Sequence, residues 1–233
     1  MRLDKFLCDN NIGTRSQVKE YIKKGQVTVN DQIIKKPETK VNNETDTVVC
    51  QGQTIHYRKY VYYMLNKPEG VVSATNDNTA PTVVSLLTVP EQKDLFPVGR
   101  LDKDTTGLLL LTNDGELANA LMHPKKQVDK TYLVWVSGYI AGKEQSLSQP
   151  IEIDGRKTSP AAVQLLHKAG TTALFRVTIH EGRNRQIRRM FEEVGKQVIF
   201  LKRIRIGEMG LGSLERGKVR RLTADEIYYL KNL

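Results

Sequence analysis

An acid in the segment from Phe96 to Gly115 is the residue of this sequence best suited to chemistry. The segment reads FPVGRLDKDTTGLLLLTNDG. Its glycines are typical of turns, and the four leucines at 108–111 are typical of a buried strand. We therefore expect Asp102 in a loop at the mouth of a core strand, two residues after Arg100. A carboxylate held there could act as a nucleophile or a base. It could also simply cap the strand or pair with Arg100.

A second group with chemical potential is the arginine-rich segment EGRNRQIRRMFEEVG at 181–195. Its apolar residues recur at helical spacing, and four arginines crowd the expected first turns: Arg183, Arg185, Arg188 and Arg189. A helix N-terminus already carries positive charge, so an anion should offset these arginines. Phosphate groups bound to the free N–H groups would do so, as would a carboxylate such as Asp102. Arg185 and Arg189 could instead be exposed, but Arg188 follows the apolar Ile187 and is expected nearer the core.

The third candidate is Tyr132, in the segment KTYLVWV at 130–136. The alternation predicts a strand with Tyr132, Val134 and Val136 on one face. A tyrosine there could belong to a site, or it could be a core aromatic with its hydroxyl satisfied.

Composition narrows the class of partner. The chain has 233 residues, 39% of them hydrophobic, a formal net charge of +10 and a pI near 9.5. Such a charge favours a polyanionic partner, with nucleic acid before an acidic membrane surface. No apolar run approaches the roughly 20 residues of a membrane span. The start of the chain shows no signal peptide, and we expect a cytoplasmic protein.

Cysteines and histidines give no metal site in the sequence. Cys8 and Cys50 are far apart and have no ligand spacing around them, so we expect two reduced thiols. The four histidines are scattered singly along the chain. We therefore expect neither a metal nor a cofactor.

The first quarter of the chain predicts a small basic module. A helix is expected from Arg2 to Asn10, and a second helix begins where Thr14 and Gln17 have capping-box spacing. Its outer face carries the basic ridge Arg15, Lys19, Lys23 and Lys24. Short strands follow, and the polar stretch at 51–59 suggests a domain boundary. The ridge could bind RNA phosphates, or it could be an ordinary solvated face.

These N-terminal motifs resemble the S4 RNA-binding module. The resemblance is carried by MRLDKFL, by Thr14-Arg15-Ser16 and by the segment GQVTVN at 25–30. It implies an S4-like domain at 1–58 and a second domain at 59–233. The residues expected to bind RNA are Arg2, Arg15, Lys19, Lys23 and Lys24.

The second domain resembles the RsuA/RluB/E/F family of ribosomal RNA pseudouridine synthases. The resemblance is carried by NKPEG at 66–70, GRLDKDTTGLLLLTNDG at 99–115, KTY at 130–132 and EGRNRQIRRM at 181–190. It implies an α+β chain: an S4-like module, then a catalytic domain with a mixed, mainly antiparallel sheet flanked by helices. It also implies that Asp102 is the essential aspartate, Tyr132 the active-site tyrosine and Arg188 the basic partner of Asp102.

The implied chemistry gives the other candidates a role. Arg188 would keep Asp102 ionised in a dry pocket, Tyr132 would stack on the uracil, and Leu201 would exclude water. The target uridine must be flipped out, so Arg100, Arg183 and Lys202 would hold the displaced backbone.

The expected partner is ribosomal RNA or a small-subunit assembly intermediate, bound by a monomer. The start and end of the chain resemble most the members that modify uridine 516 of 16S RNA. Three alternatives stay open: a synthase acting on 23S RNA, a non-catalytic RNA-binding or ribosome-assembly protein, and a glycosidase-like hydrolase using Asp102 and Asp104.

The sequence also predicts a short helix over Thr82–Val89, and it gives no secondary-structure assignment for residues 141–162.

Overall fold

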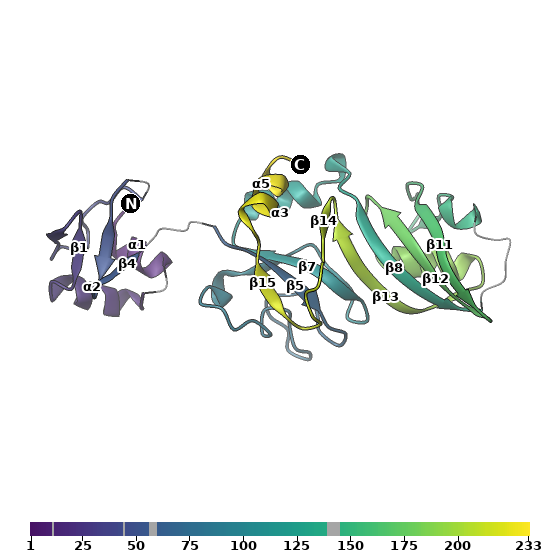
Figure 1. Cartoon of the computed structure of the whole chain (residues 1–233), viewed down its shortest axis with the longest axis horizontal. Coiled ribbons are helices and arrows are strands. Elements are labelled where there is room, and N and C mark those ends of the chain that lie inside the picture. Colours follow the sequence, from purple (N-terminus) through teal and green to yellow (C-terminus); the bar gives the residue numbers. More distant parts are fainter. Residues whose placement is uncertain (11, 44, 56–59, 139–144) are drawn as a thin grey trace. The chain divides into compact units, whose positions relative to one another are not determined.

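The computed structural model describes residues 1–10, 12–43, 45–55, 60–138 and 145–233. They form two compact units, the N-terminal unit Met1–Val61 and the C-terminal unit Tyr62–Leu233 (Figure 1). The predicted boundary between residues 58 and 59 lies outside the described residues and stays a prediction.

The N-terminal unit packs two helices against a small antiparallel sheet. The helices are α1 (Leu3–Asp9) and α2 (Arg15–Lys23), and the strands are β1 (Val27–Val29), β2 (Gln32–Ile33), β3 (Val48–Cys50) and β4 (Gln53–Ile55). The sheet order is β2-β1-β3-β4. At the start of α2, the Thr14 hydroxyl accepts a bond from Gln17 N at 3.3 Å and the Gln17 side chain accepts one from Thr14 N at 2.9 Å. The predicted capping box is therefore confirmed.

The C-terminal unit is built on one long, curved sheet. Its strands are β5 (Tyr62–Lys67), β6 (Phe96–Val98), β7 (Thr106–Thr112), β8 (Lys130–Ser137), β11 (Ala162–Ala169), β12 (Thr172–Ile179), β13 (Gln197–Ile206), β14 (Met209–Gly210) and β15 (Val219–Arg221). The order along the sheet is β11-β12-β8-β13-β7-β5-β15. Neighbouring strands are antiparallel except β13 and β7, which are parallel. The mixed, mainly antiparallel α+β fold predicted from the sequence is confirmed.

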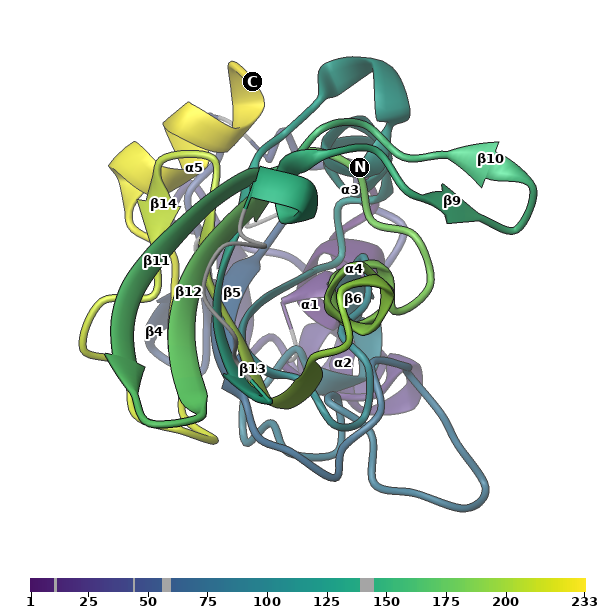
Figure 2. The ribbon, with the colours of Figure 1, turned by 90° about the vertical axis from the view of Figure 1, so that its right-hand side faces the viewer.

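Helices and short turns complete the C-terminal unit. They are α3 (Gly115–Met122), α4 (Gln186–Glu193), α5 (Ala224–Lys231), and the 3-10 turns η1 (Gln92–Asp94), η2 (Pro124–Lys126) and η3 (Gln145–Ser148). Figure 2 shows α4 on the concave side of the layer formed by β11, β12 and β13. A separate hairpin of β9 (Glu152–Ile153) and β10 (Arg156–Lys157) projects beyond α4. Within the described ranges, every helix is too short or too polar to span a bilayer.

Two central strands follow the burial patterns expected from their sequences. Every residue of β7 is buried, as the run of leucines predicts. On β8, Tyr132, Val134 and Val136 are buried whereas Trp135 is 39% exposed, as the alternation predicts. The helix predicted over Thr82–Val89 is absent, because these described residues form turns.

Candidate active site

The loop between β6 and β7 carries Asp102, and a glycine fixes where the loop meets the sheet. Gly107 has φ +106°, and a Cβ on it would lie 2.2 Å from the carbonyl oxygen of Arg203. Only glycine lets β7 approach β13 this closely. In the next pair of strands, Arg203 is opposite Tyr132. The parallel pairing of β7 with β13 thus places the loop two strands away from Tyr132.

The loop opens onto a small cavity of about 80 Å³. The predicted residues that line this active-site cavity are Arg100, Asp102, Tyr132, Arg183 and Leu201. Arg185, Gln186 and Ile187, at the start of α4, line its other side. Two predicted site residues do not line it: Arg188, expected as the partner of Asp102, and Lys202, expected to hold the displaced RNA backbone.

Asp102 and Tyr132 keep their polar atoms available to a ligand. Among the described residues, the Asp102 carboxylate forms no salt bridge, and only its main-chain carbonyl accepts hydrogen bonds. Tyr132 is buried, and its hydroxyl has no hydrogen-bond partner in the described part of the chain. Leu201 is buried on β13 beside them and supplies an apolar wall.

Arg188 pairs with Asp104, and the predicted ion pair with Asp102 is wrong for this structure. Its Nη2 lies 3.1 Å from the Asp104 carboxylate and donates to the Asp104 carbonyl at 3.1 Å, while Nη1 donates to Val198 O at 3.1 Å. These contacts fix the guanidinium behind the loop. Arg188 Nε and Asp104 Oδ1 are buried without a hydrogen-bond partner among the described residues, so the pair has unused bonding capacity.

Asp104 also explains how α4 tolerates arginines at its start. Arg185, with φ +49°, is the N-terminal cap residue, and its Nη1 lies 3.3 Å from Asp104. One carboxylate therefore offsets two guanidinium groups where the helix dipole is positive. The sequence correctly predicted that an anion offsets the arginines, and the structure supplies Asp104 as that anion.

The other side chains predicted to contact the substrate differ in whether they already bind groups of the protein. Arg183 is engaged with the β9–β10 hairpin, donating to the carbonyls of Arg156 at 2.9 Å and Lys157 at 2.7 Å and pairing with Glu181 at 3.2 Å. Arg100 is exposed and has no hydrogen bond or salt bridge with the described residues. Lys202 is half-buried on β13, outside the cavity. Their roles toward RNA stay predictions.

Lys67 is the residue that sequence reasoning missed. It is fully buried at the end of β5, and its ammonium donates to the carbonyls of Asp102 at 3.0 Å and Thr105 at 2.8 Å. It donates to Pro68 O at 3.1 Å as well. Burial lowers the pKa of Lys67 to about 8, while the charges of Asp102, Asp104 and Glu69 act in the opposite direction. A lysine at the end of a largely apolar strand is the signal that could have identified it.

Comparisons with known proteins agree with this architecture. Residues 61–193 match the RNA pseudouridylate synthase family, and residues 1–48 match the S4 domain. A ribosomal large subunit pseudouridine synthase B of Bacillus subtilis is 42% identical over 100% of this chain and 96% of its own. A ribosomal small subunit pseudouridine synthase A of Vibrio cholerae is 41% identical over 97% and 98%. A crystal structure of a pseudouridylate synthase superposes with a TM-score of 0.68 at 35% identity, covering 99% of both chains.

The chain belongs to the RNA pseudouridylate synthase family. It is thus an enzyme, and the RNA pseudouridine synthase fold places its β6–β7 loop, β8 and the start of α4 around one cavity. In the described part of the synthase, no group of three or more His, Cys, Asp or Glu side chains could hold a metal ion.

The synthase's N-terminal unit presents its basic residues to solvent. All five residues predicted to bind RNA there are exposed. Arg2 pairs with Asp4 at 2.8 Å and Lys24 with Glu20 at 2.7 Å. In the described residues, Arg15, Lys19 and Lys23 form no salt bridge. Arg2, Arg15 and Lys19 line a shared hollow of about 400 Å³. The uncommitted cations thus lie along α2, where the sequence predicted the basic ridge.

Proposed function

We propose that this enzyme converts uridine to pseudouridine in ribosomal RNA, with Asp102 as its essential catalytic group. The observation that supports this best is the Asp102 carboxylate at the cavity, beside Tyr132 and Leu201 and without a salt bridge to any described residue. A carboxylate in that state can attack the substrate, because no partner has to be displaced first.

The reaction needs one bond to break and another to form at the same ribose carbon. Asp102 either attacks C1′ and forms an ester bond to it, or removes a ribose proton. In both routes the N1–C1′ bond breaks and its electron pair stays on N1 of the uracil. The detached uracil turns and C5 bonds to C1′, while the Asp102–C1′ bond breaks or, in the other route, the ribose regains its proton. The C5 proton then leaves through the Tyr132 hydroxyl, and N1 of the product gains a proton. Tyr132 stacks on the uracil during the turn, and Leu201 keeps water from the detached base. No group from outside the chain is required by this balance.

Two contacts position Asp102 for this chemistry. Lys67 holds the main chain of the loop through the carbonyls of Asp102 and Thr105. Asp104 joins the same loop to α4 through Arg188. The Asp104–Arg188 ion pair fixes the position of the loop relative to the start of α4 on the two sides of the cavity. Lys67, Asp104 and Arg188 are therefore positioning residues in this proposal.

The cavity must open before a uridine can enter. Its volume of about 80 Å³ is well below the roughly 300–1,000 Å³ of small-molecule sites. A flipped nucleoside is larger than this cavity. Arg100 and Arg185 are the exposed charged side chains of the lining. We propose that these two swing outward onto the displaced RNA backbone as the base enters.

The finer proposal is that the target is uridine 516 of 16S RNA, modified in the cytoplasm by a monomer on the small-subunit RNA or an assembly intermediate. The relative named for the small subunit supports this target, being 41% identical over nearly the whole chain. The relative named for the large subunit is 42% identical, and it favours 23S RNA as the second candidate.

Pseudouridine mapping tests both levels of the proposal. Ribosomal RNA from cells that lack the gene should lose one pseudouridine, at position 516 of 16S RNA, and the wild-type gene should restore it. Loss of a pseudouridine from 23S RNA instead would show that the target lies in the large subunit and not at position 516 of 16S RNA. An unchanged map of both RNAs would reject the ribosomal proposal, and free uracil released from RNA by the purified protein would indicate a hydrolase.

A further inference from the structure

A second cavity, of about 640 Å³, lies next to the active-site cavity. Gly182 and Arg183 line both cavities, so the two share a wall. Met122, which also lines the second cavity, occupies the space where a Cβ on Gly99 would lie, 2.6 Å from its sulfur. One side chain thus separates this cavity from the start of the Asp102 loop.

The walls of the second cavity are held in place by the fold. Arg183 binds the carbonyls of the β9–β10 hairpin, which forms one wall. Lys130 is 6% exposed and donates to Val128 O at 2.8 Å and to His180 O at 3.3 Å, which fixes the loop after β12. The volume lies within the roughly 300–1,000 Å³ of small-molecule sites.

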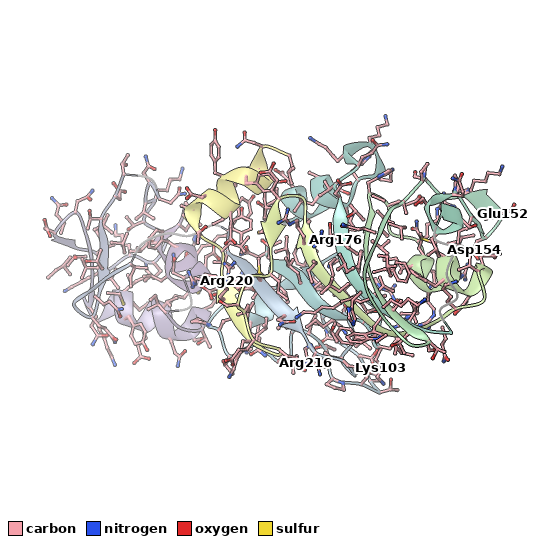
Figure 3. All side chains as sticks on the ribbon, turned by 45° about the vertical axis from the view of Figure 1, so that its right-hand side comes forward. Lys103, Glu152, Asp154, Arg176, Arg216 and Arg220 are labelled. Atoms are coloured by element: carbon pink, nitrogen blue, oxygen red, sulfur yellow. The ribbon has the colours of Figure 1, made fainter. Side chains whose placement is uncertain are left out.

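The polar groups of this cavity favour an RNA ligand. Its two acids are already paired, Asp154 with Arg189 at 3.1 Å and Glu181 with Arg183 at 3.2 Å. Figure 3 shows Asp154 beside α4, the helix that carries Arg189. In contrast, the side chains of Arg156 and His180 form no hydrogen bond or salt bridge with the described residues. Among its described lining residues, the cavity therefore offers a guanidinium and an imidazole without a partner, and every carboxylate is paired.

We propose that this cavity binds the base of the nucleotide next to the target uridine, an inference that rests on the function proposed above. When a uridine is flipped out, its neighbour loses a stacking partner. Unstacked RNA bases are bound by stacking on imidazole rings and guanidinium planes, which His180 and Arg156 provide. Because the two cavities share a wall, adjacent nucleotides can occupy both at once. The second cavity thus reads the sequence or shape beside the target.

Steady-state kinetics on matched RNAs tests this site. Three RNAs carry the same target uridine: one intact, one with an abasic residue on its 5′ side and one with an abasic residue on its 3′ side. One of the two abasic RNAs should raise the wild-type KM about tenfold, the size of effect expected for losing one stacked base. Arg156→Gln and His180→Ala should raise KM about tenfold on the intact RNA, and less than twofold on that abasic RNA.

The control variant is Arg176→Gln on β12, which removes the same charge away from the cavity and loses one exposed hydrogen bond, to Gln164. It should change KM less than twofold on every RNA. The inference is overturned if the wild type tolerates both abasic positions, or if Arg156→Gln and His180→Ala act equally on intact and abasic RNA. Absence of pseudouridine from the wild-type enzyme on every RNA would instead reject the proposed function.

Discussion

The Asp102 loop and the basic ridge of α2 carry their charges in opposite ways. Around the loop, Lys67 and Arg188 are buried and bonded to carbonyls or to Asp104. On α2, Arg15, Lys19 and Lys23 are exposed, and in the described structure they form no salt bridge. Buried charges fix geometry, whereas exposed cations act additively through released counterions. We therefore expect substitutions around the loop to change stability and turnover, and substitutions on α2 to change RNA affinity.

The largest loss of stability is expected from Gly107→Ala. The new methyl group would lie 2.2 Å from the Arg203 carbonyl oxygen at φ +106°, so β7 and β13 must separate. The expected cost is about 4 kcal/mol. Urea unfolding followed by the fluorescence of Trp135, the single tryptophan, reports on the C-terminal unit directly.

Gly115→Ala is the matched control for that substitution. Gly115 begins α3, and a Cβ on it would meet nothing within 4 Å. Alanine there should change stability by at most about 1 kcal/mol, in the stabilising direction. If the two alanine variants were equally stable, the close approach of β7 to β13 would not be the reason for a glycine.

Lys67 is expected to make stability depend on pH between about 8 and 10. Its pKa is lowered to about 8 by burial in the folded state, and is about 10.4 in an unfolded chain. In that interval the unfolded chain binds more protons, so the free energy of unfolding rises with pH, by up to about 1.4 kcal/mol per unit. Lys67→Met should remove this rise, which is measured by urea unfolding at several pH values. The same slope in both proteins would mean that another group titrates.

Asp104→Asn should lower the unfolding free energy by about 2 kcal/mol. It leaves the guanidinium of Arg188, whose side chain is 9% exposed, without a charged partner. Asp154→Asn is the matched control, because it removes the partner of Arg189 at the surface, where 74% of the Asp154 side chain is exposed. There the loss should be below about 0.5 kcal/mol. Equal losses would show that burial does not set the strength of these pairs.

On α2 the expected effects are smaller and depend on salt. Lys19→Ala should weaken RNA binding two- to fivefold and lower the slope of log K against log salt by about 0.7–0.9, the effect of one phosphate contact. Lys24→Ala should do less, because Lys24 is paired with Glu20 at 2.7 Å. Titrations at three salt concentrations measure both. A slope that neither variant changes would place the RNA on another surface.

The two regions also differ in how well the sequence predicts them. The capping box of α2 and the alternation of β8 depend on nearby residues, and both were predicted. The partner of Arg188 depends on how a loop 84 residues away in sequence is folded. Asp102 was therefore predicted as this partner, and the structure shows Asp104 in its place.

Competing local bonds explain the helix that was predicted and is absent. Thr82 N donates to the Ser85 hydroxyl at 3.2 Å, and Ser85 N donates to the Thr82 hydroxyl at 3.1 Å. These bonds resemble a helix cap, but they close a turn that stops before Pro90.

The segment 145–162 has no periodic pattern in its sequence. Its hairpin is held by Arg183, a residue far along the chain. Long-range contacts of this kind leave no local trace in a sequence.

The most direct test of the central claim is pseudouridine formation by Asp102→Asn on an RNA that contains the target uridine. The substitution removes the charge at the cavity and breaks no described salt bridge. We predict a fall in kcat of at least about 10³-fold, with an RNA dissociation constant within twofold of the wild type. Turnover within tenfold of the wild type would contradict the account, because the reaction would then not depend on the Asp102 carboxylate.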